Sequence, residues 1–332
     1  MTILVTGGAG YIGSHMVHEL VDAGEPVVVL DNLSTGFRFL IPGSVPFVAG
    51  STGDRELVSK TIARHGVTAI IHFAASIVVP ASVSDPLGYY RNNTMNTCTL
   101  LDCAVEANVK QFIFSSTAAV YGNTEQTPVR EDAVTAPISP YGSSKLMSEI
   151  MLHDTGKAHG LRFVVLRYFN VAGADPKQRT GQSTAGATHL IKVACETALG
   201  KRPKIDIYGT DYPTPDGTCI RDYVHVSDLA RAHSAALAHL RRGGESTTFN
   251  CGYGRGASVL EVIDSVRRAS GRDFAVEISG RRAGDPAALV ANVDRIRSTL
   301  DWRPQFQDLD TIVAHAFAWE RRLSSKRETA AA

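Results

Sequence analysis

The first half of the sequence predicts an α/β fold with a doubly wound parallel sheet, and two observations lead to this prediction. Short apolar runs rich in Val and Ile alternate with longer segments of helical periodicity up to residue 173. The apolar runs are nearly continuous, which is typical of strands covered by helices on both faces. Sheets of this kind bind ligands outside the carboxyl ends of their strands, so functional residues are expected directly after each strand.

The elements of the first half follow from local composition. Strands are expected where β-branched residues cluster, and helices where apolar residues recur every three or four positions. In chain order this half reads as strand 3–6, helix 11–23, strand 27–30, strand 47–49, helix 54–65, strand 69–73, helix 86–108, strand 112–116, helix 141–158 and strand 163–167.

After residue 173 the alternation weakens, which indicates a smaller and less regular second domain. Residues 174–186 are rich in Gly, Asp, Thr and Gln and read as a loop, and residues 204–217 read as a short strand followed by Pro and Gly turns. Helical patterns return near residues 227–241, 258–269 and 294–300. We therefore expect a first domain over residues 1–173, to which the chain returns around 218–245, and a second domain over 174–332.

The composition excludes several classes of protein. The chain has 332 residues and a formal net charge of +1, which gives no general attraction to nucleic acid. The hydrophobic fraction of 44% is that of an ordinary globular protein. No apolar run approaches the ~20 residues of a membrane span. No basic segment precedes the first strand, so a secretory signal is not expected.

The cysteines and histidines carry no metal or disulfide pattern. The chain has five cysteines, an odd number, and none forms a Cys-x-x-Cys pair. This usage is typical of reduced thiols and predicts a cytoplasmic location. The eleven histidines show no His-x-x-x-His motif, so no metal site is expected.

A glycine-rich turn between the first strand and the first helix predicts a dinucleotide site. Gly7, Gly10 and Gly13 are spaced three residues apart, which allows a tight turn and lets a pyrophosphate approach the helix N-terminus. The strand, turn and helix supply the context that this motif requires. Asp31 ends the second strand, where a carboxylate accepts both adenosine ribose hydroxyls and repels a 2′-phosphate. The predicted cofactor of this Rossmann-type domain is therefore NAD, not NADP.

Hydroxyl groups gather at the end of the fifth strand and at the start of the helix that follows. Tyr141 and Lys145 are separated by four residues and share one helix face. A phenol has a pKa near 10 and is a poor base at neutral pH, but a nearby ammonium and a cationic nicotinamide ring favour the phenolate. Thr117 is placed to relay a proton or to bind the reacting oxygen. The three residues are the predicted catalytic set.

These motifs, with several further ones, resemble the extended short-chain dehydrogenase/reductase family, and within it the sugar-nucleotide 4-epimerases. The similarity runs over nearly the whole chain. Its motifs are the glycine-rich loop, His72–Ala75, Asn92–Asn93, Phe114–Thr117, Tyr141 with Lys145, Arg167–Asn170, Asp211–Thr214, Arg221–Val226 and Arg281–Asp285.

The resemblance implies the ligand contacts. The positions matching those that hold the UDP group are Asn170, Arg221, Arg282 and Asp285, and arginine forks suit a diphosphate. Further implied substrate contacts are Thr117, Tyr141, His189, Leu190, Ile207 and Tyr208. Implied NAD contacts, besides the three glycines and Asp31, are Tyr11, Ile12, Asn32, Ser51, Thr52, Phe73, Ala74, Ala75, Asn93, Ser115, Tyr141, Lys145 and Tyr168.

The resemblance also implies an activity. UDP-galactose and UDP-glucose would be interconverted through a 4-keto sugar, with Tyr141 as the base and tightly bound NAD taking up and returning a hydride. The 4-keto sugar would turn over between the two steps, which requires a firm hold on UDP and a loose one on the hexose. In relatives the helices matching 86–108 and 141–158 form a two-fold interface, so a homodimer is expected.

Other readings stay open at this point. Leu289 stands where glucose/galactose enzymes tend to have Tyr, which leaves room for a UDP-N-acetylhexosamine; a uronic acid or pentose sugar nucleotide is a further alternative. Sugar-nucleotide dehydratases and decarboxylases carry acids where this chain has Ala118 and Ala119, which cannot transfer a proton. A non-catalytic NAD-sensing regulator would not need Tyr141 and Lys145.

Overall fold

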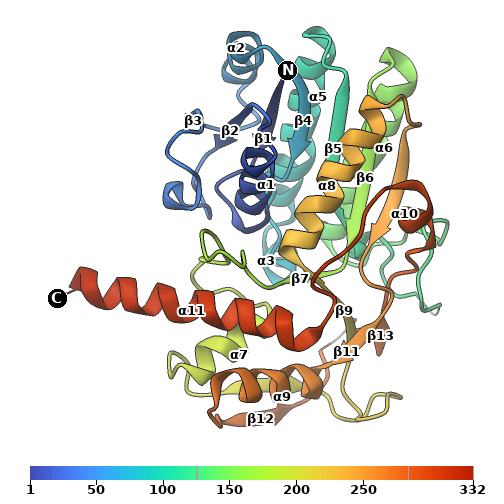
Figure 1. Cartoon of the computed structure of the whole chain (residues 1–332). Coiled ribbons are helices and arrows are strands. Elements are labelled where there is room, and N and C mark those ends of the chain that lie inside the picture. The colour runs from blue at the N-terminus through green and yellow to red at the C-terminus, as the bar shows by residue number, and fades with distance from the viewer. Residues whose placement is uncertain (125, 283, 332) are drawn as a thin grey trace.

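A seven-stranded parallel sheet forms the centre of the larger part of the molecule (Figure 1). The computed structural model describes residues 1–124, 126–282 and 284–331, so Ala283 of the predicted 281–285 motif lies outside the described residues. The strand order is β10-β6-β5-β4-β1-β2-β3. The strands are β1 Thr2–Thr6, β2 Val27–Asp31, β3 Phe47–Ala49, β4 Val67–His72, β5 Gln111–Thr117, β6 Arg162–Tyr168 and β10 Thr247–Cys251. The predicted doubly wound α/β fold is confirmed.

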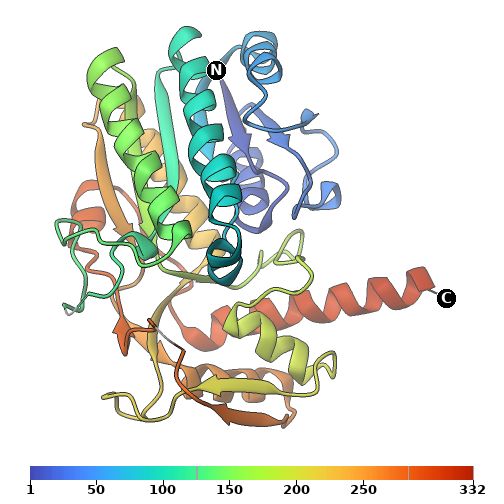
Figure 2. The same cartoon turned by 180° about the vertical axis from the view of Figure 1, so that it is seen from behind.

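Helices cover both faces of this sheet. Tyr11–Asp22 (α1) and Val226–Arg241 (α8) pack together on one face, and Arg55–His65 (α2), Asn96–Glu106 (α5) and Pro140–His159 (α6) cover the other (Figures 1 and 2). Short helical turns are α3 Val79–Ser84, α4 Pro86–Tyr89, η1 Arg38–Leu40 and η3 Ala118–Val120. The helix predicted over 86–108 is divided by a π-helical turn, η2, at Tyr90–Met95.

The nearly continuous apolar strands follow from this two-sided burial. Successive residues of a strand point to opposite faces. Accordingly, Ile3 and Val5 belong to the apolar cluster under one layer of helices, whereas Leu4 belongs to the cluster under the other. Both faces of the sheet therefore require apolar residues, and no polar alternation remains along these strands.

The smaller part contains two short sheets and three of the remaining helices among the described residues; the fourth, α10 Asp294–Thr299, lies against β10 of the large sheet (Figure 1). The first sheet pairs β7 Asn170–Ala172, β9 Ile220–His225, β11 Gly256–Ser258 and β13 Ala288–Leu289, and the second pairs β8 Ile205–Tyr208 with β12 Val276–Ser279. The three helices of the smaller part are α7 Leu190–Ala198, α9 Val259–Ser270 and α11 Leu309–Ala331. α11 packs along α7 and α9, and its end projects beyond the rest of the chain (Figure 1).

Two of these helices were not among the predicted elements. α7 has nine residues and begins at Leu190; the side chain of its N-cap, His189, makes no capping hydrogen bond, so the helix lacks the usual start signal. α11 is long, but it packs against neighbours that come from distant parts of the chain. Strand β10 was also missed, and it extends the sheet beside β6.

Three buried histidines make the stability of the fold sensitive to acid. Burial lowers the pKa of His15 and of His233 to about 4 and that of His72 to about 3. In the unfolded chain a histidine has a pKa near 6.5, so between about pH 6.5 and 4 the unfolded state binds more protons. The stability contributed by the neutral rings is complete above pH 6.5 and is lost as the pH falls toward 4.

We therefore expect the urea midpoint of unfolding to fall steeply below pH 6.5. Each of the three rings contributes up to about 1.4 kcal/mol per pH unit to the slope of the free energy of unfolding against pH. In His15→Gln the free energy of unfolding is expected to fall less steeply between pH 6.5 and 5, by up to about 1.4 kcal/mol per pH unit, because one proton fewer is taken up on unfolding. His159→Gln, at an exposed position, is the matched control. Equal slopes in wild type and His15→Gln would contradict the prediction.

Candidate active site

The glycine-rich turn joins β1 to α1 and leaves no room for side chains. Gly7 has a φ of +69°, and a Cβ there would lie 2.6 Å from the Ala74 nitrogen. A Cβ on Gly13 would lie 2.1 Å from the Gly7 carbonyl oxygen. Gly10 is the N-cap of α1 and supplies no capping side chain, and the first turn of the helix carries no acidic residue. The helix N-terminus thus offers N–H groups and a favourable dipole to a phosphate.

Asp31 ties the end of β2 to this turn. Its Oδ2 accepts a hydrogen bond from the Ala9 nitrogen at 2.9 Å, and its Oδ1 accepts one from the Leu33 nitrogen at 2.7 Å. Burial raises the pKa of this carboxyl. A carboxylate has about four acceptor positions, so each oxygen can still accept a hydroxyl. The remaining acceptor positions of Asp31 therefore fit the hydroxyls of a cofactor with an unphosphorylated ribose.

The segment after Asp31 packs against the C-terminal helix, α11. The Phe37 nitrogen donates to the Ala9 carbonyl at 2.9 Å, which holds the segment against the glycine-rich turn. Behind Phe37, an apolar cluster joins Leu40 to Trp319 and Leu323 of α11. The C-terminal helix thus supports the proposed cofactor site.

Most of the other predicted cofactor residues lie near the ends of β3, β4, β5 and β6, and Asn93 lies in η2. Phe73 packs against the His233 ring, with 4.7 Å between the ring centroids. His233 Nδ1 donates to the Leu229 carbonyl, so its Nε2 accepts from Ser115 Oγ at 2.7 Å. Asn93 is buried, and its amide donates to the Ser76 carbonyl and to Ser144 Oγ. Asn93 therefore fixes the loop after β4.

The remaining members of this set divide by exposure. Thr52 is buried, and Asn32 is exposed. Half-buried positions are Tyr11, Ile12, Ser51, Ala74, Ala75 and Tyr168. Ser51 Oγ accepts from the Gly53 nitrogen, which shapes the turn after β3.

Of the predicted catalytic residues, Tyr141 is hydrogen-bonded to Thr117, and Lys145 lies one turn further along the same helix. Ser139 caps α6 by accepting from the Gly142 nitrogen, which sets Tyr141 in the first turn. Thr117 ends β5. Burial raises the pKa of Tyr141 to about 12, and a hydrogen bond with Thr117 acts in the opposite direction. Burial lowers the pKa of Lys145 to about 7. The Lys145 ammonium lies 4.2 Å from the centroid of the Phe114 ring.

A buried ion pair, which the sequence reasoning missed, continues this row of α6. Glu149 is one turn beyond Lys145, and its carboxylate raises the pKa of that lysine against the larger effect of burial. Glu149 accepts from Arg167 Nη2 at 2.6 Å and from Ser116 Oγ. Arg167 also donates to Tyr121 Oη at 3.1 Å. The available signals were the four-residue spacing from Lys145 and the arginine that ends the predicted apolar strand 163–167.

The predicted phosphate-binding residues gather around β9. Arg221 pairs with Leu289 in the register of β9 and β13, and its guanidinium lies 3.5 Å from an oxygen of Asp285. Arg221 Nη1 also donates to the Pro286 carbonyl at 2.9 Å. The Arg282 guanidinium lies 3.6 Å from the centroid of the Tyr208 ring. Arg221 and Asp285 thus meet beside β9, whereas Arg282 lies over Tyr208 of β8, in the second small sheet.

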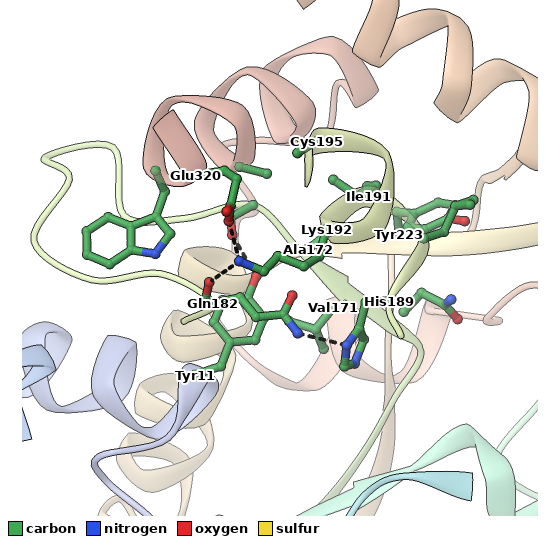
Figure 3. Close-up of a pocket in the computed structure, with 15 residues that line it drawn as sticks. Tyr11, Val171, Ala172, Gln182, His189, Ile191, Lys192, Cys195, Tyr223 and Glu320 are labelled. Atoms are coloured by element: carbon green, nitrogen blue, oxygen red, sulfur yellow. Dashed lines mark hydrogen bonds and ion pairs between the residues drawn. The ribbon is translucent and has the colours of Figure 1, made fainter. Parts of the chain in front are cut away.

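A pocket lies where Tyr11 of α1 faces β7, α7 and α11 of the smaller part (Figure 3). It is lined by Asn170, His189 and Leu190 of the predicted substrate residues, together with Tyr11. Asn170 pairs with Tyr223 in the register of β7 and β9. The lining also includes Tyr223 and Gln182, which were not predicted. The side chain of Ile207 packs in the core and does not line this pocket.

Residues 1–124, 126–282 and 284–331 contain no group of three or more His, Cys, Asp or Glu side chains that could hold a metal ion. Over the same ranges, no helix is both long and apolar enough to cross a membrane.

Comparisons with known proteins give consistent results. Residues 3–252 match the NAD dependent epimerase/dehydratase family. A UDP-glucose 4-epimerase of Azospirillum brasilense is 60% identical over 321 residues, covering 97% of this chain and 92% of the relative. The crystal structure of a UDP-glucose 4-epimerase from Brucella ovis in complex with NAD is 44% identical, with a TM-score of 0.93, and the match covers 96% of this chain and 97% of that one. The crystal structure of a UDP-glucose 4-epimerase from Bifidobacterium longum in complex with NAD⁺ and UDP is 36% identical, with a TM-score of 0.91, and the match covers 97% of this chain and 98% of that one.

Proposed function

Since this chain belongs to the NAD dependent epimerase/dehydratase family, we propose that it interconverts UDP-galactose and UDP-glucose with NAD as its cofactor. The single observation that carries the proposal is the buried set of Tyr141, Lys145 and Thr117 at the sheet edge that also bears the glycine-rich turn. Their combination suits removal of a proton from a sugar hydroxyl next to a dinucleotide.

The cofactor would be held by the residues at the carboxyl ends of β1 to β6. The N-terminus of α1 suits the pyrophosphate, and Asp31 suits the adenosine ribose. NAD, when bound, supplies the acceptor for the hydride of sugar carbon 4 and later returns it. Phe73, Ser115 and Tyr168 border the place where its reactive end would lie.

Tyr141 would take the proton of the 4-hydroxyl and later return it. Burial alone makes the phenol a weaker acid, so the site needs a positive charge to favour the phenolate. Lys145, on the same helix face, provides that charge. Thr117 binds the Tyr141 hydroxyl and orients it toward the sheet edge. The proton thus moves between the sugar oxygen and Tyr141 Oη.

The substrate would be held by its UDP group. Arg221 and Arg282 are suited to the diphosphate, and Asp285 beside them is suited to a hydroxyl or base N–H group. Asn170, His189 and Leu190 would contact the nucleotide from the pocket. The charged groups gather around UDP, which allows the hexose to turn between the two hydride transfers.

We further propose how the chain divides and where it acts. Residues 1–173, with the returning segment that supplies α8 and β10, would form the NAD-binding domain, and most of 174–332 would bind UDP-sugar. The cysteines of the described residues are free, which supports a cytoplasmic location.

The test is to incubate purified protein with UDP-galactose, without added NAD, and to follow UDP-glucose. Turnover is expected, because the reaction returns its hydride and NAD stays bound. No turnover, even after NAD is supplied, would overturn the glucose/galactose assignment. A parallel reaction with UDP-N-acetylglucosamine tests the wider substrate range suggested by Leu289, and no detectable rate would exclude it.

We also propose that the protein is a homodimer. α5 and α6 lie side by side on the outer face of the larger part (Figure 2). Large apolar side chains stand exposed on and beside these helices: Leu87 at 64%, Met95 at 62%, Met147 at 45% and Ile150 at 53%. A second copy would cover them. Light scattering should give the mass of a dimer for wild type and of a monomer for Ile150→Glu; a monomeric wild type would contradict the proposal.

A further inference from the structure

A histidine that is hydrogen-bonded to a glutamine side chain lies at the proposed nucleotide subsite. His189 Nδ1 is 2.8 Å from Gln182 Nε2, and Figure 3 shows the amide pointing at the ring. An amide nitrogen can only donate, so Nδ1 accepts and the ring proton is on Nε2. Burial lowers the pKa of His189, so the ring is neutral near pH 7. His189 therefore offers one N–H donor.

Gln182 is itself held in place from two directions. Lys192 Nζ donates to the Gln182 carbonyl at 3.1 Å, and the same ammonium pairs with Glu320 of α11 in a buried position. The preceding residue, Gly181, lies against Trp319 so closely that a Cβ would be 2.4 Å from the indole. The backbone of Gln182 is thus fixed between α7 and α11, which limits where its amide can point.

Among the described residues, the ring of His189 makes no hydrogen bond that would give it a structural role in α7. His189 is the N-cap of α7, but its side chain makes no capping hydrogen bond. Within the part of the chain that the structure describes, its one side-chain hydrogen bond is the one from Gln182, and the ring lines the pocket next to Asn170 and Leu190. A phosphate oxygen only accepts hydrogen bonds at neutral pH, so a bare ring nitrogen would face it with an unfavourable lone pair.

We propose that Gln182 is a positioning residue that holds His189 in the Nε2–H form, so that this N–H donates to a phosphate or ribose oxygen of the UDP group. The inference rests on the proposed function for the identity of that ligand. An asparagine at this position would carry a donor in its own amide and would need no such partner. Gln182 is therefore required only because a histidine occupies the site.

The experiment measures the Kd of UDP by calorimetry for the protein as purified. Gln182→Met removes the amide and keeps the length of the side chain. It is expected to raise the Kd about two- to tenfold, as the loss of one hydrogen bond would, and to leave kcat at saturating UDP-galactose unchanged. His189→Asn is the matched background, because its own amide supplies the donor. There, Gln182→Met is expected to have no further effect. Two-bond ¹H–¹⁵N spectra should show the Nε2–H form in wild type and a mixture in Gln182→Met.

Three results would overturn the inference: an unchanged Kd in folded Gln182→Met, an equal rise in the His189→Asn background, or the Nδ1–H form in wild type. Thermal unfolding of each variant separates a loss of fold from a loss of binding. A protein that binds UDP with the expected pattern but does not epimerise UDP-galactose would support the pair and overturn the proposed function instead.

Discussion

Replacing Tyr141 by phenylalanine is expected to lower kcat for UDP-galactose by about 10²- to 10⁴-fold. The hydroxyl is the group that takes the 4-hydroxyl proton, and Lys145 cannot replace it because it lies a full helical turn further along α6. The ring of Tyr141 is buried and stays in place, so the fold should survive. Single-turnover kinetics with UDP-galactose measure the loss directly.

Tyr89→Phe is the matched control for this prediction. Tyr89 is also a buried tyrosine close enough to influence the pKa of Tyr141, and its hydroxyl donates to the Val78 carbonyl at 2.7 Å. Its removal is expected to change kcat by less than about tenfold, because one neutral hydrogen bond is lost away from the reacting oxygen. Comparable losses in both variants, or a Tyr141→Phe enzyme with near-normal turnover, would refute the role of Tyr141 as the base.

Glu149→Ala is expected to lower the free energy of unfolding by about 3–5 kcal/mol. The side chains of Glu149 and Arg167 are 2% and 9% exposed, so the substitution leaves a buried arginine without its carboxylate. Ser116 and Tyr121 lose part of their network at the same time. The urea midpoint of unfolding, compared with wild type at one pH, measures the effect.

The double variant Glu149→Leu with Arg167→Met separates the pair from the surrounding packing. Two apolar side chains of similar size leave no unpaired charge, so most of the stability should return. Its kcat is still expected to be reduced, because Lys145 loses the carboxylate that favours its ammonium form. If the free energy of unfolding of Glu149→Ala were within about 1 kcal/mol of the wild-type value, the ion pair would not be what stabilises this edge of the sheet.

The cofactor half of the site was predictable because its residues follow strands with strong patterns. Asp31 and Thr117 are the last residues of β2 and β5, and the glycine-rich turn follows β1. In a parallel sheet all such positions meet at one edge, so their proximity follows from the order of the elements alone. Tyr141 and Lys145 needed only the spacing of a helix.

The substrate half was harder to predict, for a physical reason. β7 has three residues and β13 has two, which is too short for any periodicity. The pairing of Asn170 with Tyr223 and of Arg221 with Leu289 depends on chain segments that meet only in the folded protein. Without the resemblance to a known family, the residues alone would not have indicated Asn170, Arg221 or Asp285. Gln182 lay in a segment predicted as a loop and carried no signal of its own.

The place of β10 in the sheet has a consequence for synthesis on the ribosome. A nascent chain that has emerged only as far as β6 has no strand to pair with the outer edge of β6, and α8 is not yet present to cover β5 and β6. Such an intermediate exposes an apolar face and a strand edge together, which favours association with other chains. The protein therefore depends on its later residues to complete its earlier half, and a fragment ending near residue 173 should aggregate where the full chain does not.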